Sequence, residues 1–482
     1  MRQADRGLAF SARSFRDPSA TTFVLPQGVF RVVDAQVAAE LQGVLATGGV
    51  QGFVADGRLI GTRPCPVDEL DQALGGNAIP AGEYACFRHD RVAFPSFAYE
   101  WPAAMLHAAG RLTLDLARTL LAHGYGLKDA TPFNVLFRGP KPVFVDVTSI
   151  EARRPGDPLW MAEGQFLRSF LLPLLLERDT GLGPRELFLS RPDGIEPADA
   201  FGILGPLRAL RGPALRLVAL PTLFGGKADR QGQALYASRD TDPPKARFIL
   251  DHLMGRLGRL LDGLTPRQST SAWTGYVDER TYGDADLEAK ATFVERALDG
   301  VSTLLDVGCN TGEFSLAAAA RGCSVVAVDS DAAVVGRLWA RAAEQGLDIL
   351  PLVVDVSQPT PGTGFLNAQF PSFLDRCDSV GGFDGVLMLA VIHHLMVSAG
   401  LPLRAVVDLA ARLTRRRLVL EIVLPEDPMF RRIARGREDL FADLTREAVL
   451  TALARRFDVV DVQDINQGTR CLVSCDRKEA AL

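Results

Sequence analysis

Lysine is scarce in this chain of 482 residues, and its positive charge is carried almost entirely by arginine. The lysines are Lys128, Lys141, Lys227, Lys245, Lys290 and Lys478. Acidic residues outnumber basic ones, 58 to 53, which gives a formal net charge of −5. An acidic balance argues against a large nucleic-acid-binding surface, so we expect no nucleic-acid partner.

Cysteine pairs, targeting signals and long apolar runs are also missing. Seven cysteines are scattered without a Cys-x-x-Cys pair, which suits a reducing cytoplasm and offers no metal site. Residues 1–17 are polar and arginine-rich, unlike a signal peptide. The longest apolar run, Phe170 to Leu176, contains Pro173 and is too short to cross a bilayer. We therefore expect a cytoplasmic globular protein without a membrane span.

The segment from Leu304 to Phe314 is the most informative part of the sequence. It predicts a buried strand, a turn bracketed by Gly308 and Gly312, and then a helix. Small residues in such a turn let the backbone approach a ligand closely, and the helix N-terminus presents free N–H groups. Asn310, inside the turn, is the non-glycine residue type that best tolerates a left-handed backbone. The segment therefore predicts a ligand cradle.

Two common nucleotide motifs do not fit this turn. A dinucleotide fold requires Gly-x-Gly-x-x-Gly, but Asn310 stands at the middle glycine and no third glycine follows at that spacing. The Gly-Lys-Ser/Thr of a P-loop is absent as well. Instead, three successive predicted strands end near a carboxylate, at Asp306, Asp329 and Asp355. Asp329 follows the first glycine by about 20 residues, where an adenosine-type ligand requires an acceptor for its ribose.

This pattern resembles motif I of class I S-adenosylmethionine (SAM) methyltransferases, where an Asp/Glu-x-Gly-x-x-x-Gly turn is typical. The resemblance implies SAM as the cofactor. Gly308 and Gly312 would border its methionine and ribose parts. Asp329 would accept hydrogen bonds from the ribose hydroxyls, and Asp355 would accept one from the adenine amino group. Asp306 would steady the loop or meet the methionine amine.

Strands and helices alternate through the second half of the chain, which implies a parallel sheet with helices on both faces. Strands are predicted at 303–307, 324–328, 350–354, 384–389, 417–423, 457–463 and 469–475. Helices are predicted at 312–321, 331–345, 402–413 and 444–455. No helix separates the last two strands. We therefore predict an α/β, Rossmann-like sheet of seven strands with an antiparallel closing pair, the class I methyltransferase arrangement.

The first half of the chain resembles a protein kinase. A long amphipathic helix, Trp101 to His123, precedes Asp129 and Asn134, which match the Asp-x-x-x-x-Asn spacing of a kinase catalytic loop. In kinases that Asp is the base and that Asn a metal ligand. Asp146 follows a predicted strand, where the second metal-binding Asp would stand. The resemblance implies an α+β kinase-like domain.

The sequence departs from the kinase pattern at several points. Leu127-Lys128 replaces the usual His-Arg, Asp146 is not followed by glycine, no glycine-rich loop occurs, and no lysine precedes Lys128. Losing the cation that neutralises phosphates should cost on the order of several kcal/mol of transition-state stabilisation. We therefore favour a kinase-derived domain without phosphotransfer, in which Asp129, Asn134 and Asp146 are vestigial. The alternative is that Asp129 and Asp146 merely cap turns.

A polar segment after Leu264 indicates a domain boundary. We place a kinase-like domain at 1–265, with a small lobe at about 10–100 and a large lobe at about 101–265. A methyltransferase domain follows at 266–482. As a whole, the chain resembles bacterial class I SAM-dependent methyltransferases with a kinase-like N-terminal extension. Residues carrying this resemblance include Ser14 to Ser19, Tyr99 to Trp101, Trp273, Tyr276, Lys290, Ile392 to Leu395, Glu421 to Val423 and Asp427 to Met429.

The methyl acceptor is expected beyond the carboxyl end of the fourth strand, where His393 and His394 follow. Histidine can take a proton near neutral pH, as a hydroxyl acceptor requires, so either is a candidate base. The alternative is a capping or core role. Glu421, Trp273 and Tyr276 are candidates for acceptor binding. Alternatively, Glu421 is a charge facing water, and the aromatic segment packs on the sheet.

These observations predict a bacterial SAM-dependent methyltransferase that acts on a hydroxyl of a sugar or secondary metabolite. Its partner would be a small-molecule or glycan acceptor, and ATP or a carrier is the candidate ligand of the N-terminal domain. Two alternatives stay open. One is a bifunctional enzyme that phosphorylates and methylates one acceptor. The other is a non-catalytic module that binds SAM.

Overall fold

The computed structural model describes residues 20–76, 84–224, 241–266 and 283–478. The chain divides into two compact units, the first comprising residues 1–267 with 362–370 and the second residues 268–361 with 371–482. The first unit therefore includes one short segment, Gly362–Phe370, from the second half of the sequence. The two units are described separately below.

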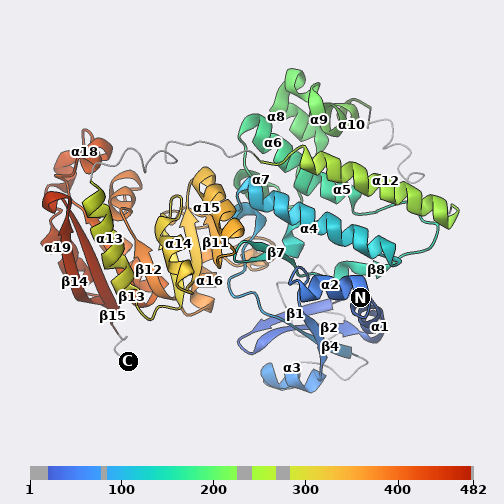
Figure 1. The fold of residues 1–482 in the computed structure, drawn as a ribbon, viewed down its shortest axis with the longest axis horizontal. Helices are drawn as coiled ribbons and strands as arrows, with labels where there is room; N and C mark the ends of the chain where they lie inside the picture. The colour runs from blue at the N-terminus through green and yellow to red at the C-terminus, as the bar shows by residue number, and fades with distance from the viewer. Residues whose placement is uncertain (1–19, 77–83, 225–240, 267–282, 479–482) are drawn as a thin grey trace. The chain divides into compact units, whose positions relative to one another are not determined.

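The second unit is built on a seven-stranded sheet of order β11-β10-β9-β12-β13-β15-β14 (Figure 1). The first five strands in sequence pair in parallel, whereas β15 is antiparallel to both β13 and β14. This confirms the predicted α/β sheet and its antiparallel closing pair. The strands are β9 (Thr303–Val307), β10 (Ser324–Asp329), β11 (Ile349–Val353), β12 (Phe383–Met388), β13 (Thr414–Val423), β14 (Phe457–Ile465) and β15 (Arg470–Arg477).

Helices connect these strands, and each predicted helix is present within two residues of its expected bounds. The helices are α13 (Asp284–Ala297), α14 (Glu313–Ala320), α15 (Ala332–Gln345), α16 (Phe373–Ser379), α17 (Leu403–Leu413), α18 (Pro428–Ala434) and α19 (Arg446–Leu453), with a π-helix, η10 (His394–Ser398), and a 3-10 helix, η11 (Glu438–Phe441). The sequence analysis missed α13, α16 and α18. Both α16 and α18 are only two turns long, so their apolar periodicity is too short to recognise.

The strands of this sheet carry apolar side chains on both faces, as strands between two helical layers require. Leu304, Leu387 and Val419 are fully buried in neighbouring strands, together with Phe293 from α13. Burying a side chain of this size stabilises the fold by about 1.5–3 kcal/mol. The core therefore holds the carboxyl ends of β9, β10, β11 and β12 in a fixed arrangement, with a loop following each.

The first unit begins with a four-stranded antiparallel sheet of order β1-β2-β4-β3. Its strands are β1 (Ala20–Leu25), β2 (Gly28–Asp34), β3 (Thr62–Cys65) and β4 (Tyr84–His89). Helices α1 (Ala35–Leu45), α2 (Gly48–Ala55) and α3 (Val67–Ala73) are interspersed with these strands. Two short antiparallel pairs follow, β5 (Tyr125–Leu127) with β8 (Ile150–Ala152), and β6 (Val135–Arg138) with β7 (Lys141–Phe144).

Helices form the remainder of the first unit, and the two longest, α4 and α12, lie side by side (Figure 1). The helices are α4 (Ala103–Ala122), α5 (Glu163–Phe166), α6 (Leu172–Thr180), α7 (Pro184–Ser190), α8 (Pro197–Ala209), α9 (Gly212–Ala214), α10 (Leu220–Phe224) and α12 (Pro243–Asp262), with the π-helices η5 (Leu167–Leu171) and η6 (Leu215–Ala219) and the 3-10 helices η2 (Ala98–Glu100), η3 (Pro132–Asn134), η4 (Val147–Ser149) and η9 (Phe365–Asn367). Among the residues that the structure describes, no helix combines the length and hydropathy needed to cross a bilayer.

Candidate active site

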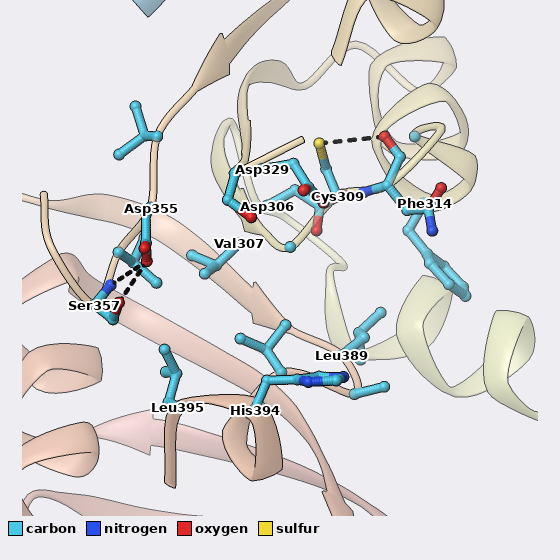
Figure 2. Close-up of a pocket in the computed structure, with 18 of the residues that line it drawn as sticks. Asp306, Val307, Cys309, Phe314, Asp329, Asp355, Ser357, Leu389, His394 and Leu395 are labelled. Carbon is cyan, nitrogen blue, oxygen red and sulfur yellow. Dashed lines mark hydrogen bonds between the residues drawn. The ribbon is translucent and has the colours of Figure 1, made fainter. Parts of the chain in front are cut away.

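A cavity of about 510 Å³ opens at the carboxyl ends of the central strands of the second unit (Figure 2). The end of an open parallel sheet, where strand order reverses, is the usual place for a ligand in this architecture. Here the reversal lies between β9 and β12. The cavity lining includes Lys290, Asp306, Gly308, Asn310, Gly312, Phe314, Asp329, Asp355, Ser357, Val391 and His394.

The glycine turn between β9 and α14 forms one wall of the cavity. Gly308 and Gly312 have φ angles of 70° and 81°, and Asn310 has the left-handed conformation expected of it, with φ at 49°. A side chain at Gly308 would collide with Val391, and one at Gly312 would collide with Leu338. Glycine is therefore required at both positions for conformational and steric reasons. The missing side chains make room for Val391 and Leu338, and both glycines line the cavity.

Asp306 and Asp329 stand beside this turn, on adjacent strands. The Asp306 carboxylate accepts a hydrogen bond from the Ser315 hydroxyl at 2.6 Å. Burial, together with the neighbouring charge of Asp329, raises the pKa of Asp306 to about 6, although the Ser315 bond opposes this. Burial likewise raises the pKa of Asp329. A buried and a half-buried carboxylate in one wall make the site favourable for a cation.

Asp329 also fixes the shape of the turn. Its two carboxylate oxygens accept hydrogen bonds from the backbone N–H groups of Asn310 and Asp331, each at 3.0 Å. A carboxylate has about four acceptor sites, so both oxygens can still accept from a ligand hydroxyl. Asp355, beyond β11, is tied in a similar way, because its Oδ1 accepts from the backbone N–H of Ser357 at 2.8 Å and from the Ser357 hydroxyl at 2.6 Å (Figure 2).

The two histidines differ in their access to the cavity. His394 begins the π-helix η10 and lines the cavity across from Asp306 and Asp329 (Figure 2). His393 is only 3% exposed and is absent from the cavity lining. Its ring lies beside those of His394 and Phe430, with centroids 4.3 and 6.3 Å away. Burial lowers the pKa of both imidazoles, so both are neutral near pH 7.

Glu421 belongs to a buried ion-pair network beneath the sheet end. Its carboxylate is fully buried and accepts from Lys290 Nζ at 2.5 Å and from Arg470 Nη1 at 2.9 Å. Arg470 also donates to Asp427 at 2.7 Å. Burial alone would raise the pKa of Glu421, but Lys290 and Arg470 outweigh it and hold that pKa below its usual value. Glu421 therefore does not face water, the alternative considered above, and it reaches the cavity through Lys290.

Asp146 in the first unit is paired with an arginine of the small sheet. Its Oδ1 accepts from Arg31 Nη1 at 2.6 Å and from the Thr148 hydroxyl at 2.8 Å. Burial opposes ionisation, but the Arg31 charge outweighs it and lowers the pKa of Asp146. Asn134 is nine-tenths buried, and its amide nitrogen has no hydrogen-bond partner in the described part of the chain.

Asp129 lies in a different environment from Asp146. It lines a hollow of about 470 Å³ together with Lys128, residues 159–165, Leu167 and Arg168. Neither Asn134 nor Asp146 lines that hollow. Trp273 and Tyr276, the aromatic candidates for acceptor binding, lie outside the described residues.

The residues around the main cavity fit an adenosine cofactor that carries positive charge. A ligand in the cavity could approach the backbone at Gly308 closely. A positive charge on that ligand would offset part of the free-energy cost of burying the Asp306 and Asp329 carboxylates. Sequence reasoning did not assign roles to Lys290, Ser315, Ser357 or Val391. The sequence did contain a hint for Lys290, because a single lysine between Lys245 and Lys478 stands out in a chain that otherwise uses arginine. The others are common residue types whose partners are set by the fold.

Comparisons with known proteins agree with this site. A family model described as a methyltransferase domain matches residues 280–461. The nodulation protein NoeA of Rhizobium meliloti (strain 1021) is 30% identical over 474 residues, which is 97% of this chain and 96% of NoeA.

Solved structures align with a smaller share of the chain. The N-methyltransferase NodS from Bradyrhizobium japonicum WM9, in complex with S-adenosyl-L-homocysteine (SAH), is 18% identical over 43% of this chain and all of NodS, with a TM-score of 0.31. The bifunctional kinase-methyltransferase WbdD is 18% identical over 40% of this chain and 38% of WbdD, with a TM-score of 0.28. The similarity to NoeA, in contrast, runs through nearly the whole of both chains. This chain therefore belongs to the family of NoeA and is a SAM-dependent methyltransferase.

Proposed function

We propose that the enzyme methylates the oxygen of a hydroxyl group, on a sugar or a secondary metabolite, with His394 as the base. The observation that carries this proposal is the different placement of the two histidines. His394 lines the cofactor cavity, whereas His393 is buried beside Phe430. Because burial lowers its pKa, the His394 imidazole is neutral at pH 7 and can accept a proton.

The cofactor would be held by the residues of the glycine turn and the three strand ends. Gly308, Asn310 and Gly312 would border its methionine and ribose parts, Asp329 would accept from the ribose hydroxyls, and Asp355 from the adenine amino group. Asp306 sits closest to the base of the turn, where its carboxylate would face the positively charged methionine end. The buried Ser315 hydroxyl keeps that carboxylate oriented.

SAM supplies an electrophilic methyl group bonded to a sulfonium. The protein's contribution is to hold the acceptor oxygen about 3 Å from that methyl and in line with the bond that breaks. As the new oxygen–carbon bond forms, the hydroxyl proton passes to a ring nitrogen of His394. Bases placed in this way contribute about 100- to 10,000-fold to the rate. Phe314 and Leu389 line the cavity and would shield the reacting atoms from part of the water.

Two matched substitutions test the base. We expect His394→Gln to lower turnover at least about 100-fold, with SAH affinity by calorimetry nearly unchanged. His393→Gln should leave most of the turnover, because His393 does not line the cavity. SAH formation with a panel of hydroxylated sugars and natural products, together with amines of similar size, provides the readout. Full turnover in His394→Gln would remove the base assignment, and turnover only with amine acceptors would remove O-methylation.

For the first unit, we propose a kinase-derived domain that does not transfer phosphate. The ion pair between Arg31 and Asp146 supports this, because a guanidinium occupies the carboxylate that would bind a metal in a kinase. Asp129 is also set apart, since it lines a hollow to which Asp146 does not contribute. The residues Asp129, Asn134 and Asp146 would then be vestigial.

The alternative hypothesis is a bifunctional enzyme that phosphorylates and methylates one acceptor. Calorimetric titration with magnesium and ATP, and phosphate transfer from labelled ATP to the same acceptor panel, separate the two readings. We expect no phosphate incorporation in the wild-type protein. Incorporation that disappears in Asp146→Ala would establish the bifunctional enzyme and overturn our proposal.

A further inference from the structure

Helices α8 and α10 of the first unit expose a group of large apolar side chains. Leu207 is 74% exposed, Phe224 66% and Leu223 59%, and Ile203, Leu210 and Leu220 are also exposed. We call these six residues the α8–α10 face. The helices that carry them contact one another directly and through η6 (Figure 1). Several large apolar side chains exposed on elements that pack together are typical of an interaction surface.

The exposure follows from how these helices are built. Gly205, with φ at 72°, and Pro206 break α8, and the chain resumes helical structure with Leu207 pointing away from the core. The opposite side of α8 is anchored by the buried residues Leu204 and Ala209, and η6 is anchored by the buried Val218. No residue of α10 is buried. The α8–α10 face therefore joins the exposed side of an anchored helix to a short helix that is itself exposed.

The charged residues on the segment that carries this face are all arginines, although Arg208 also donates to the backbone oxygen of Asp179, which is itself paired with Arg178. Arg208, Arg211 and Arg216 are exposed on the same helices and their connection. From Phe201 to Phe224 the sequence contains no aspartate or glutamate. Asp199, just before this stretch, is paired with Arg191. Because the whole chain has a net charge of −5, this local cationic character is contrary to the average.

We propose that the α8–α10 face docks onto an anionic phospholipid bilayer. Apolar side chains next to arginines suit the boundary between headgroups and acyl chains, where leucine and phenylalanine enter the apolar layer and guanidinium groups bind phosphates. A second copy of the chain fits less well. In a two-fold interface the same three arginines would face each other, and like charges opposed in this way weaken association.

Vesicle co-sedimentation of the full-length protein tests this proposal. We expect binding to vesicles of phosphatidylcholine mixed with phosphatidylglycerol, weak binding to phosphatidylcholine alone, and a loss of binding at high salt. Each arginine near an anionic surface contributes about 1 kcal/mol, so Arg211→Gln with Arg216→Gln should weaken binding roughly 30-fold. Leu223→Ser with Phe224→Ser should also weaken it, because the apolar contribution is lost.

The matched control removes the same charge elsewhere in the first unit. Arg63 and Arg91 are exposed at the four-stranded sheet, and Arg63→Gln with Arg91→Gln should bind vesicles as the wild type does. Equal losses in the patch and control variants would overturn the proposal, as would a wild-type protein that ignores anionic vesicles. Self-association in sedimentation velocity that depends on the patch, without vesicle binding, would assign the face to a second copy instead. None of these readouts depends on the methyl acceptor.

Discussion

Gly308 is central to the cofactor cradle that we propose. Its φ of 70° disfavours any side chain, and an added Cβ would collide with the neighbouring side chain of Val391. We expect Gly308→Ala to weaken SAH binding at least about tenfold, since backbone strain of this kind costs on the order of 1–3 kcal/mol. Gly322 is the matched control, because it has φ at 93° with open space around an added Cβ. Gly322→Ala should lower stability but leave calorimetric SAH affinity unchanged; equal affinity losses in both would contradict the prediction.

Asp306 carries a stability cost that depends on pH. Its pKa in the folded protein is about 6, above the ordinary 3.8, so the folded state binds this proton more tightly than the unfolded state. Ionising Asp306 therefore opposes folding, and the wild type should lose roughly 2 kcal/mol between pH 4 and pH 7 from this group alone. Asp306→Asn keeps an acceptor for Ser315 and has no such cost.

Urea unfolding at several pH values measures this effect. We expect Asp306→Asn to gain stability relative to the wild type as pH rises through 6, and to bind SAM more weakly. If the free energies of unfolding of the two proteins changed in parallel with pH, other interactions would compensate for the cost of ionising the buried Asp306. A gain in stability coupled with a loss of cofactor affinity would mean that the carboxylate is kept for binding at the expense of folding.

At the scale of elements, the strands β13 and β15 offer two ion pairs that differ mainly in burial. Arg470 bridges Glu421 and Asp427 with all three side chains buried, whereas Arg417 pairs with Asp476 near the surface. Removing one partner of a buried pair leaves charges without compensation. We expect Arg470→Ala to cost about 3–5 kcal/mol and Arg417→Ala about 1 kcal/mol or less, as measured by urea unfolding.

The same network has a defined pH dependence. Because Lys290 and Arg470 hold the pKa of Glu421 below 4.5 against the effect of burial, the stabilisation is complete above pH 4.5. It is lost as pH falls towards the lower pKa of the folded state. Arg470→Ala should reduce this acid sensitivity without removing it, because Lys290 still pairs with Glu421. If both arginine variants cost the same, the buried network would be no stronger than a surface pair.

Elements with long, regular patterns were predictable from the sequence, whereas partners across the sheet were not. The strands and the longer helices of the second unit followed from alternation and from glycine positions. The burial of Glu421 could not be foreseen, because its two partners come from α13 and β15, far away in sequence. Likewise, the sequence alone shows that no lysine precedes Lys128. It does not show that Arg31 on β2 pairs with Asp146, because the two residues come together only in the folded chain.

At the scale of the whole molecule, neither of the two units is a single continuous stretch of the sequence. Gly362–Phe370 belongs to the first unit, and the backbones of Thr363 and Phe370 close this segment by hydrogen bonds in both directions at 2.9 and 3.1 Å. The Phe370 ring lies 5.2 Å from that of Phe97 and 4.7 Å from that of Phe133. The stability of the first unit therefore depends on a residue that the sequence places among the methyltransferase strands.

Calorimetric unfolding with and without SAH can test this dependence, because a ligand raises the transition of the unit that binds it. We expect two transitions, of which only the one from the second unit rises with SAH. Phe370→Ala should lower the other transition by a few degrees, as expected from the loss of about 1–3 kcal/mol of aromatic packing. Phe365 is 44% exposed in the same segment, so Phe365→Ala should shift that transition less. A Phe370→Ala shift confined to the SAH-responsive transition would mean that this segment stabilises the methyltransferase unit, and the division of the chain would then have to be redrawn.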